Sequence, residues 1–413
     1  MTFADWQTLK PAEAAQLIHR KVDALPPAQR RAVFAHLESE EDIAARLSEC
    51  PAVAPLGRLP CMLKDVFDIG GWPTRAGSSF LAEVRAVPAA DGALAQTVRS
   101  LGAVIAGKTH LYEFAYGLTG ENAHYGDVEH PRFPGRTSGG SSSGSAAAVA
   151  AGVVPLAFGT DTAGSVRVPA AFCGLFGFRM TPHHPWISDA FPLSPSFDTA
   201  GWFTANAGDM AGVLGALLGL HEDSRGLRGA WLELPGSDEV VASAQRAAAA
   251  RFASPLEESQ AGRLRDAFED SPAAFSTLRA PEAWAVHAAW AESMASRYSP
   301  AVYERLSAGR KSTLAAKSAA EAVNARLRAL LSLLWTAYDF LVLPATPCVA
   351  PSAGGCTQAV RDRILRFTAP ISLAGLPVLS IPIALPGGLS TGLQIVAPRL
   401  DSPAFLQVLK TLR

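Results

Sequence analysis

The sequence contains little cysteine, and the cysteines it has are poorly spaced for a disulfide framework or a metal site. Among 413 residues there are five cysteines, an odd number, and no two of them form a Cys-x-x-Cys pair. The nine histidines form neither a His-x-His nor a His-Glu-x-x-His pattern. Zinc sites use such closely spaced ligands, so we expect no metal site. The cysteines, which we expect to be small buried side chains, are Cys50, Cys61, Cys173, Cys348 and Cys356.

The sequence also lacks an excess of charge of one sign and an apolar run long enough to cross a membrane. The formal net charge is −1, which gives no electrostatic reason to expect a nucleic acid or an anionic membrane as partner. Two uncharged stretches are 137–160, which is rich in glycine and serine, and 210–220, which is too short for a bilayer. Since no basic region followed by an apolar run opens the chain, we expect no signal peptide and a cytoplasmic protein.

The apolar content is high enough for a large core, because hydrophobic residues make up 49% of the chain. Helical spacing predicts helices through 1–50, the second of them over 27–47. A strand over 59–69, a helix over 90–101 and a strand over 103–107 follow. This strand–helix–strand order favours an α/β fold with a partly parallel sheet.

The remainder of the chain continues the α/β pattern without a repeat or a linker. A helix over 316–335 leads into a strand over 340–343, and residues 221–280, rich in alanine, serine and glutamate, are expected to be peripheral. We therefore predict one compact domain, made of an N-terminal helical segment (1–50) and a larger unit (51–413). The other predicted elements are a helix over 146–151, strands over 153–158, 378–382 and 392–396, and helices over 210–220 and 402–412.

Lys64 is the first candidate for a catalytic residue. It ends the apolar run Leu59-Pro-Cys-Met-Leu and precedes Asp65. Burial at the end of a strand would favour the neutral amine and lower its pKa, which would make it a usable general base. The alternative is a surface lysine paired with Asp65.

Two serine-bearing loops are the second chemical feature. Ser141, Ser142 and Ser143 follow two glycines, and Ser165 follows Thr-Ala-Gly. Small neighbours let a substrate approach closely, and consecutive backbone N–H groups over 162–165 could converge on an oxyanion. The alternatives are a phosphate cradle, although no lysine follows these glycines as a P-loop requires, and a flexible linker. No Gly-x-Ser-x-Gly elbow surrounds Ser165.

These loops resemble the amidase signature family. The matching blocks are Gly139-Gly-Ser-Ser-Ser-Gly-Ser and Gly159-Thr-Asp-Thr-Ala-Gly-Ser-Val-Arg-Val-Pro-Ala, with Ser141 and Ser165 spaced as in the family. The lysine block at 59–69 and the blocks at 340–347 and 376–382 also match, so the resemblance spans about residues 55–400. The segments 120–126 and 197–203 are similar to those of short, plant-type indole-3-acetamide amidases.

The resemblance implies an α/β fold with a mixed, largely parallel central sheet covered by helices on both faces, and it implies a role for each matched residue. Ser165 would be the nucleophile, Ser141 a bridging serine after a cis peptide bond, and Lys64 the base at the end of the relay. Ser142, Asp161 and Arg167 would support the loops. No cofactor is implied. The backbone amides of Thr162, Ala163, Gly164 and Ser165 would form the oxyanion hole, although many members have glycine where this chain has Ala163.

The function implied is hydrolysis of a small-molecule carboxylic amide through an acyl-enzyme, with aryl- or indoleacetamide-like substrates. Two alternatives stay open: a hydrolase of urea-derived or carbamate substrates, and the A subunit of a glutamine-dependent amidotransferase. The chain could act as a homodimer. We expect an apolar substrate pocket, and core packing is the alternative for its aromatic candidates. The candidates are Phe114, Tyr116, Glu121, Asn122, Tyr125, Phe191 and Trp202.

Overall fold

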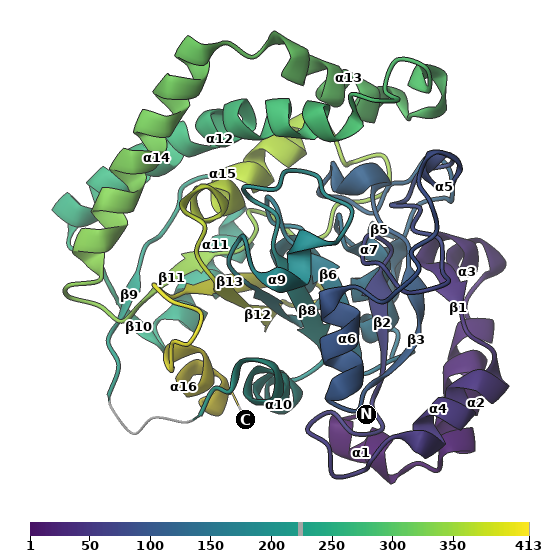
Figure 1. Ribbon diagram of the computed structural model, residues 1–413. Coiled ribbons are helices and arrows are strands. Elements are labelled where there is room, and N and C mark those ends of the chain that lie inside the picture. Colours follow the sequence, from purple (N-terminus) through teal and green to yellow (C-terminus); the bar gives the residue numbers. More distant parts are fainter. Residues whose placement is uncertain (222–225, 413) are drawn as a thin grey trace.

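An eleven-stranded sheet runs through the computed structural model, which describes residues 1–221 and 226–412 (Figure 1). The strands lie in the order β1-β3-β2-β6-β8-β7-β12-β13-β11-β9-β10, and β4 (Glu129–His130) pairs with β5 (Phe133–Thr137) separately. The strands of the large sheet are β1 (Phe34–Leu37), β2 (Pro60–Lys64), β3 (Val104–Thr109), β6 (Leu156–Thr160), β7 (Phe176–Arg179), β8 (Ala200–Thr204), β9 (Gly229–Trp231), β10 (Ala253–Pro255), β11 (Phe340–Pro344), β12 (Val378–Ala384) and β13 (Ser390–Val396).

The sheet is mixed, as predicted, but antiparallel pairing is more frequent in it than expected. Of the ten pairings between the described strands of this sheet, four are parallel and six are antiparallel. The connection from β12 to β13 shows why: it spans only 385–389, and antiparallel neighbours need no crossover helix, whereas parallel ones do. The α/β class is confirmed, and the expectation of a largely parallel sheet is corrected.

The predicted helix over 27–47 is wrong, because the chain enters the sheet in its middle. Phe34–Leu37 forms β1, which pairs antiparallel with β3 at the sheet edge. Strand pairing overrides the helical spacing here, and the Ser39 side chain caps the helix that follows by accepting from the Asp42 N–H at 3.0 Å. The 1–50 segment thus shares the central sheet; its status as a separate unit stays a prediction. Its helices are α1 (Phe3–Thr8), α2 (Pro11–Asp23), α3 (Pro27–Val33) and α4 (Glu40–Glu49).

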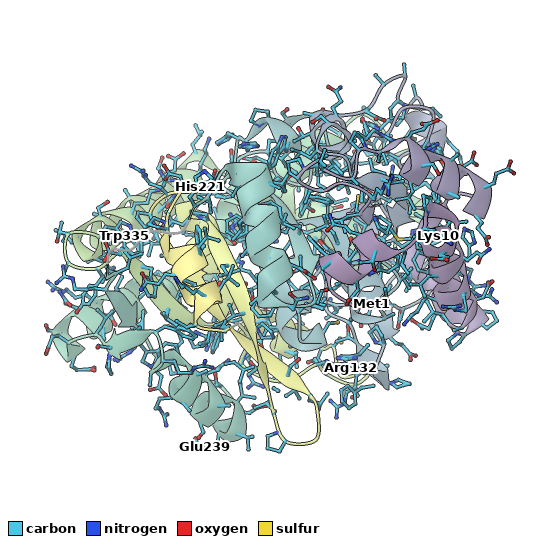
Figure 2. All side chains as sticks on the ribbon, turned by 90° about the horizontal axis from the view of Figure 1, so that it is seen from below. Met1, Lys10, Arg132, His221, Glu239 and Trp335 are labelled. Carbon is cyan, nitrogen blue, oxygen red and sulfur yellow. The ribbon has the colours of Figure 1, made fainter. Side chains whose placement is uncertain are left out.

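Helices cover both faces of the sheet. The α10 and α16 helices pack on one another below the sheet, and α12, α14 and α15 form an arch above it (Figure 1). Seen from below, Met1 and Lys10 lie at the opposite side of the molecule from Trp335 and Glu239 (Figure 2). The helices after α4 are α5 (Leu81–Val84), α6 (Ala93–Ser100), α7 (Ser143–Ala150), α8 (Arg167–Cys173), α9 (Pro185–Ser188), α10 (Ala207–Leu218), α11 (Glu239–Ala249), α12 (Glu258–His287), α13 (Pro300–Ala308), α14 (Leu314–Leu334), α15 (Gln358–Ala374) and α16 (Ala404–Lys410).

The expectation that 221–280 is peripheral needs correction for the part that the structure describes. Residues 222–225 lie outside the described residues, but α12 packs on α13, α14 and α15 and lines a cavity with Ser276 and Arg279. A composition rich in alanine and glutamate is typical of a helix face, and it does not reveal what the other face contacts.

The parallel pair β2 and β6 brings the chemically interesting residues together. Leu63 pairs with Phe158, so both strands end at the same edge of the sheet. Lys64 is the last residue of β2, and Thr160 is the last residue of β6. Sites in α/β sheets commonly lie at the carboxyl ends of strands, and the serine loops meet at this edge.

Candidate active site

Lys64 lies in the interior among three hydroxyl groups. Its side chain is fully buried, and its Nζ lies 2.8 Å from Ser141 Oγ, 3.1 Å from Ser142 Oγ and 2.7 Å from Thr160 Oγ1. No described residue supplies a carboxylate within ion-pair distance of this amine. Burial lowers the pKa of Lys64 to about 7, against the opposing charges of Asp198 and Asp161. Near neutral pH a large fraction of this lysine is therefore an uncharged amine.

The hydrogen bonds around Lys64 indicate which hydroxyl group the lone pair of its neutral amine faces. The Ser142 hydroxyl donates to the Thr160 carbonyl oxygen at 3.0 Å, so its hydrogen is not available to Lys64. A neutral amine has two N–H groups and one lone pair. If the N–H groups are donated to Ser142 and Thr160, the lone pair faces the hydroxyl of Ser141, which can then donate its hydrogen to Lys64.

The alternative reading of Lys64, a surface lysine paired with Asp65, does not hold. Asp65 is buried and pairs instead with Lys108, whose Nζ lies 2.6 Å from Asp65 Oδ1. Lys108 belongs to β3, the neighbour of β2. The chain therefore has two buried lysines on adjacent strands, one with a carboxylate and one with hydroxyl groups only.

The loop before α7 brings Ser141 to the amine. The Gly140–Ser141 peptide bond is cis. A Cβ atom on Gly140 would lie 2.0 Å from the Thr119 carbonyl oxygen, so this position admits only glycine. The Ser142 N–H donates to the Ser165 carbonyl oxygen at 3.3 Å, which joins the two serine loops directly.

Ser165 and the backbone around it face a cavity. Ser165, Thr162 and Ala163 line it together. Among the described residues no acceptor is found for the N–H groups of Thr162, Ala163 and Ser165, so these three remain free to bind an oxyanion. The Gly164 N–H instead donates to Asp161 Oδ1 at 2.8 Å, which corrects the expectation of a fourth donor. Ala163 is not among the described residues with positive φ, so its Cβ is tolerated there.

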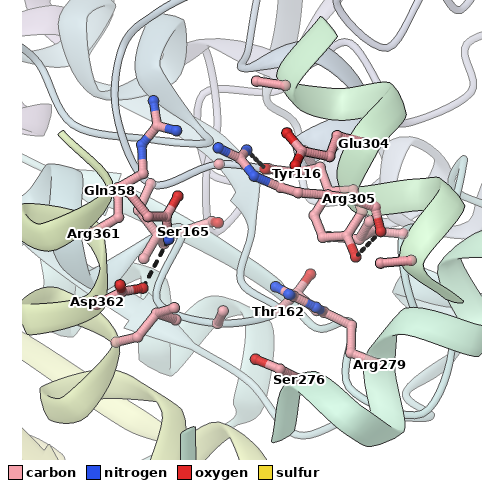
Figure 3. Close-up of a pocket in the computed structure, with 18 residues that line it drawn as sticks. Tyr116, Thr162, Ser165, Ser276, Arg279, Glu304, Arg305, Gln358, Arg361 and Asp362 are labelled. Atoms are coloured by element: carbon pink, nitrogen blue, oxygen red, sulfur yellow. Dashed lines mark hydrogen bonds between the residues drawn. The ribbon is translucent and has the colours of Figure 1, made fainter. Parts of the chain in front are cut away.

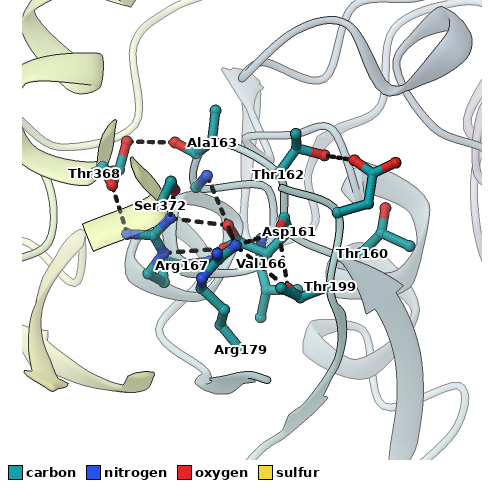
Figure 4. Close-up of polar contacts among 12 residues, drawn as sticks. Thr160, Asp161, Thr162, Ala163, Val166, Arg167, Arg179, Thr199, Thr368 and Ser372 are labelled. Carbon is teal, nitrogen blue, oxygen red and sulfur yellow. Dashed lines mark hydrogen bonds and ion pairs between the residues drawn. The ribbon is translucent and has the colours of Figure 1, made fainter. Parts of the chain in front are cut away.

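Asp161 holds the loop in place through a buried ionic network (Figure 4). Its carboxylate pairs with Arg167 and Arg179, each at 2.9 Å, and accepts from the Val166 N–H at 3.0 Å. Burial alone would raise the pKa of Asp161, but the two guanidinium groups hold it well below its ordinary value. Since Asp161 stays ionised, the loop that carries Ser165 is fixed by charge-assisted hydrogen bonds.

Arg167 uses all of its hydrogen-bond donors. Its Nε and one Nη2 hydrogen bind Asp161, at 3.0 and 2.9 Å. The other donors reach across the core to the Thr368 carbonyl oxygen, Gln394 Oε1 and Ser372 Oγ. A guanidinium has five N–H groups, so Arg167 is fully satisfied and ties the Ser165 loop to α15 and β13.

A second buried carboxylate, Asp198, supports the loop from the other side. It accepts from the Thr162 hydroxyl and from the N–H groups of Leu193 and Ser194, the latter two at 2.8 and 2.9 Å. Burial raises the pKa of Asp198 to about 6, although these hydrogen bonds and the Lys64 charge oppose the shift. Asp198 therefore orients Thr162 and acts electrostatically on Lys64.

The cavity beside Ser165 has a volume of about 610 Å³, which suits a small molecule. It lies between the serine loop and helices α12, α13 and α15, and its wall is more charged than the sequence suggested (Figure 3). The polar and charged side chains that line it are Tyr116, Thr162, Ser165, Ser276, Arg279, Glu304, Arg305, Gln358, Arg361 and Asp362.

Of the predicted pocket residues, only Tyr116 lines this cavity. Trp202 is fully buried and stacks on Phe178, and Tyr125 stacks on His110. Glu121 lies behind the wall and pairs with Arg361.

The other three predicted pocket residues are also structural. The Asn122 amide donates to the carbonyl oxygens of Gly77 and Leu111. Phe114 and Phe191 pack against His287 in an aromatic cluster. Core packing, the alternative for the aromatic residues, thus holds for Phe114, Phe191 and Trp202, whereas Tyr125 is half-buried and stacks on His110.

The sequence analysis missed Thr160, Arg179, Asp198 and the cavity arginines. Two of them could have been found from the sequence, because Thr160 and Arg179 are the last residues of buried apolar strands, as Lys64 is. For Arg279, on a helix far along the chain, no local pattern pointed to the site.

The described residues contain no group of three or more histidine, cysteine, aspartate or glutamate side chains suited to a metal ion. Within 1–221 and 226–412, no helix has both the length and the apolar character needed to cross a bilayer.

Comparison with known proteins identifies the class. The Amidase family model matches residues 13–229 and 232–406, so the chain belongs to this family. It is an amide hydrolase of the α/β amidase fold. A solved structure described as "Crystal structure of amidase" superposes with a TM-score of 0.83 at 28% identity, covering 100% of this chain and 99% of that one.

Three curated relatives show how varied the family is. The chain is 32% identical to the 1-carboxybiuret hydrolase subunit AtzE of Pseudomonas sp. (strain ADP), over 90% of this chain and 87% of that protein. It is 31% identical to Amidase 1 of Oryza sativa subsp. japonica, over 87% and 90%. It is 44% identical to the indoleacetamide hydrolase of Pseudomonas savastanoi, over 41% and 36%. These similarities establish amide hydrolysis and leave the particular substrate open.

Proposed function

We propose that the chain hydrolyses a small-molecule carboxylic amide through an acyl-enzyme on Ser165, with Ser141 and Lys64 as the proton relay. The observation that carries the proposal is the buried Lys64 amine, 2.8 Å from Ser141 Oγ and without a carboxylate among the described residues. A lysine in a structural role would be paired, as Lys108 is with Asp65. An unpaired amine with a lowered pKa is suited to general-base catalysis.

In the first half-reaction Ser141 gives its proton to neutral Lys64 and takes the proton of Ser165. The Ser165 Oγ forms a bond to the amide carbon, and the N–H groups of Thr162, Ala163 and Ser165 stabilise the resulting oxyanion. The proton returns through Ser141 to the amide nitrogen, the C–N bond breaks, and ammonia or an amine leaves. An acyl ester remains on Ser165.

In the second half-reaction water takes the place of the leaving group. It gives a proton to the relay, adds to the ester carbon and releases the carboxylate, and Ser165 regains its proton. One amide and one water are consumed, and one carboxylate and one ammonium or amine are produced. No residue beyond this constellation is required for the proton balance.

Two substrate types are starting points for the acyl group. The relative that hydrolyses indoleacetamide supports arylacetamides, and the 1-carboxybiuret hydrolase subunit supports urea-derived amides. The charged cavity wall favours the second type over the apolar arylacetamides. Ammonia release from indoleacetamide, phenylacetamide and biuret would compare them directly.

Ser165 is expected to be labelled by a fluorophosphonate probe, because its hydroxyl faces the cavity beside free backbone donors. Intact-protein mass spectrometry should show one adduct, and peptide mapping should place it on Ser165. Ser165→Ala should abolish both labelling and ammonia release. Ser188→Ala, on the short helix α9 where its hydroxyl donates to Pro185, is the matched control and should be labelled as the wild type is. Absence of an adduct on a folded wild-type protein would refute the nucleophile.

The rate should rise with pH across neutrality. Lys64 must be neutral to accept a proton, and with a pKa of about 7 its neutral fraction increases as pH rises through that value. We expect kcat/KM for a neutral amide to increase about tenfold between pH 6 and pH 8 and then to level off. Asp198 and Asp161 are the acidic groups that act on Lys64. A profile that is flat from pH 5 to pH 8 would contradict Lys64 as the base.

A further inference from the structure

Three arginines line the cavity that holds Ser165, and they differ in their polar partners. Arg279 comes from α12, Arg305 from α13 and Arg361 from α15. Arg361 pairs with the carboxylate of Glu121. Arg305 donates to the Tyr116 carbonyl oxygen at 2.7 Å and to the Tyr112 hydroxyl at 3.3 Å.

Arg279 lacks both kinds of partner among the described residues. No carboxylate of the described residues lies within ion-pair distance of it, and its Nε is buried without an acceptor. Its guanidinium lies over the ring of Tyr116, 4.6 Å from the centroid, and 5.2 Å from that of Phe275. Burial lowers the pKa of Arg279, although the Tyr116 hydroxyl and the charge of Asp198 oppose the shift, and the residue as a whole is half-buried. An isolated cation in such a place is unfavourable unless an anion joins it.

The acidic side chains of the cavity do not supply that anion. Glu304 and Asp362 also line it, but both are exposed, and Asp362 accepts from the Gln358 amide at 2.8 Å. Figure 3 shows the Arg279 side chain extending from α12 into the cavity, whose floor includes Thr162 and Ser165. The unbalanced positive charge therefore faces the space that the substrate of Ser165 would fill.

We propose that the substrate is an anionic amide, one that carries a carboxylate besides its amide group, and that Arg279 binds this carboxylate. The inference rests on the proposed function of Ser165. The guanidinium carbon lies 4.6 Å from the centroid of the Tyr116 ring, and the planar fork of an arginine is suited to a two-point contact with carboxylate oxygens. The chemical class is that of short dicarboxylic acid monoamides or of N-acyl amino acids, which place the carboxylate on the acyl part and on the amine part respectively.

Matched substrates separate these cases. Succinamate carries a carboxylate on the acyl part, N-butanoylglycine carries one on the amine part, and butanamide has the same acyl length without charge. We expect the wild type to prefer at least one of the two anionic amides over butanamide by tenfold or more in kcat/KM, which corresponds to a typical charge-assisted hydrogen bond. Preference for butanamide over both would overturn the inference.

Arg279→Met tests the residue itself. The ratio of kcat/KM for the preferred anionic amide to that for butanamide should fall by about tenfold or more, mainly through KM. In the Ser165→Ala background, calorimetric titration with succinamate or N-butanoylglycine should show the same loss of affinity without any turnover. An unchanged ratio and unchanged affinity would refute the assignment.

Stability distinguishes a binding residue from a structural one. Because Arg279 has no carboxylate partner to lose, and methionine keeps an apolar contact with the rings of Tyr116 and Phe275, Arg279→Met should not lower the melting temperature. Arg310→Met is the matched control, since Arg310 is exposed, pairs with Glu292 at 3.0 Å and lies outside the cavity. It should leave the substrate ratio unchanged. A clear drop in the melting temperature of Arg279→Met, with no change in the ratio, would show a structural role.

Labelling of Ser165 and hydrolysis of butanamide distinguish a failure of the role of Arg279 from a failure of the proposed function. If Ser165 is labelled and butanamide is hydrolysed but anionic amides are not preferred, only the role of Arg279 fails. If Ser165 is not labelled and no amide is hydrolysed, the proposed function fails with it.

Discussion

Replacing Lys64 by methionine is expected to lower kcat by at least about 10³-fold, because the relay loses its final proton acceptor. Methionine fills a similar volume, and the Ser142 hydroxyl keeps its hydrogen bonds with the carbonyl oxygen and the N–H of Thr160. The variant should therefore remain folded. Ammonia release measures the first effect, and circular dichroism with thermal unfolding measures the second.

Lys108→Met is the matched control, since it removes the other buried lysine of the same sheet region. Lys108 neutralises the buried carboxylate of Asp65, so its loss leaves an unpaired charge in the core. This variant should be clearly destabilised but should retain turnover in its folded fraction. A Lys64→Met protein with near wild-type kcat, or two variants with the same pattern, would contradict the distinction between a catalytic and a structural lysine.

The residues of the proposed relay could be named from the sequence because the short segments around them resemble blocks of the amidase signature family, whereas the residues by themselves left a surface lysine and a phosphate cradle open. Lys64 ends an apolar strand, and Ser141 and Ser165 follow small residues that a tight loop needs. The structure brings Lys64 and Ser141 into contact, and the backbone of Ser142 joins Ser165. These segments can be recognised in the sequence because the backbone geometry of the serine loops requires small neighbouring residues.

The pocket could not be predicted in the same way. Its wall consists of single side chains from α12, α13 and α15, which converge only through tertiary packing. Aromatic residues near the motifs, such as Phe114 and Trp202, were natural candidates, yet burial in the core satisfies them equally well. The strand β1 escaped detection for a related reason, since its pairing with β3 is not encoded in its own spacing.

Replacing Asp161 by asparagine should be the most destabilising single change in the Ser165 loop. The substitution keeps the shape of the side chain but leaves Arg167 and Arg179 as buried cations without a counter-charge. Breaking a buried pair by removing one partner typically costs about 3–5 kcal/mol. We expect a loss of this size in the free energy of unfolding, measured by urea denaturation, together with reduced turnover because the oxyanion donors lie on the same loop.

A double-mutant cycle with Arg179→Met would show that the cost comes from the unpaired cations. In the Asp161→Asn background, removal of Arg179 takes away one uncompensated charge, so it should cost less than it does in the wild type. Asp401→Asn is the control, because Asp401 forms an exposed pair with Arg399 and should leave the stability nearly unchanged. If Asp161→Asn were as mild as Asp401→Asn, or if the two core substitutions were additive, the loop would not depend on this ionic network.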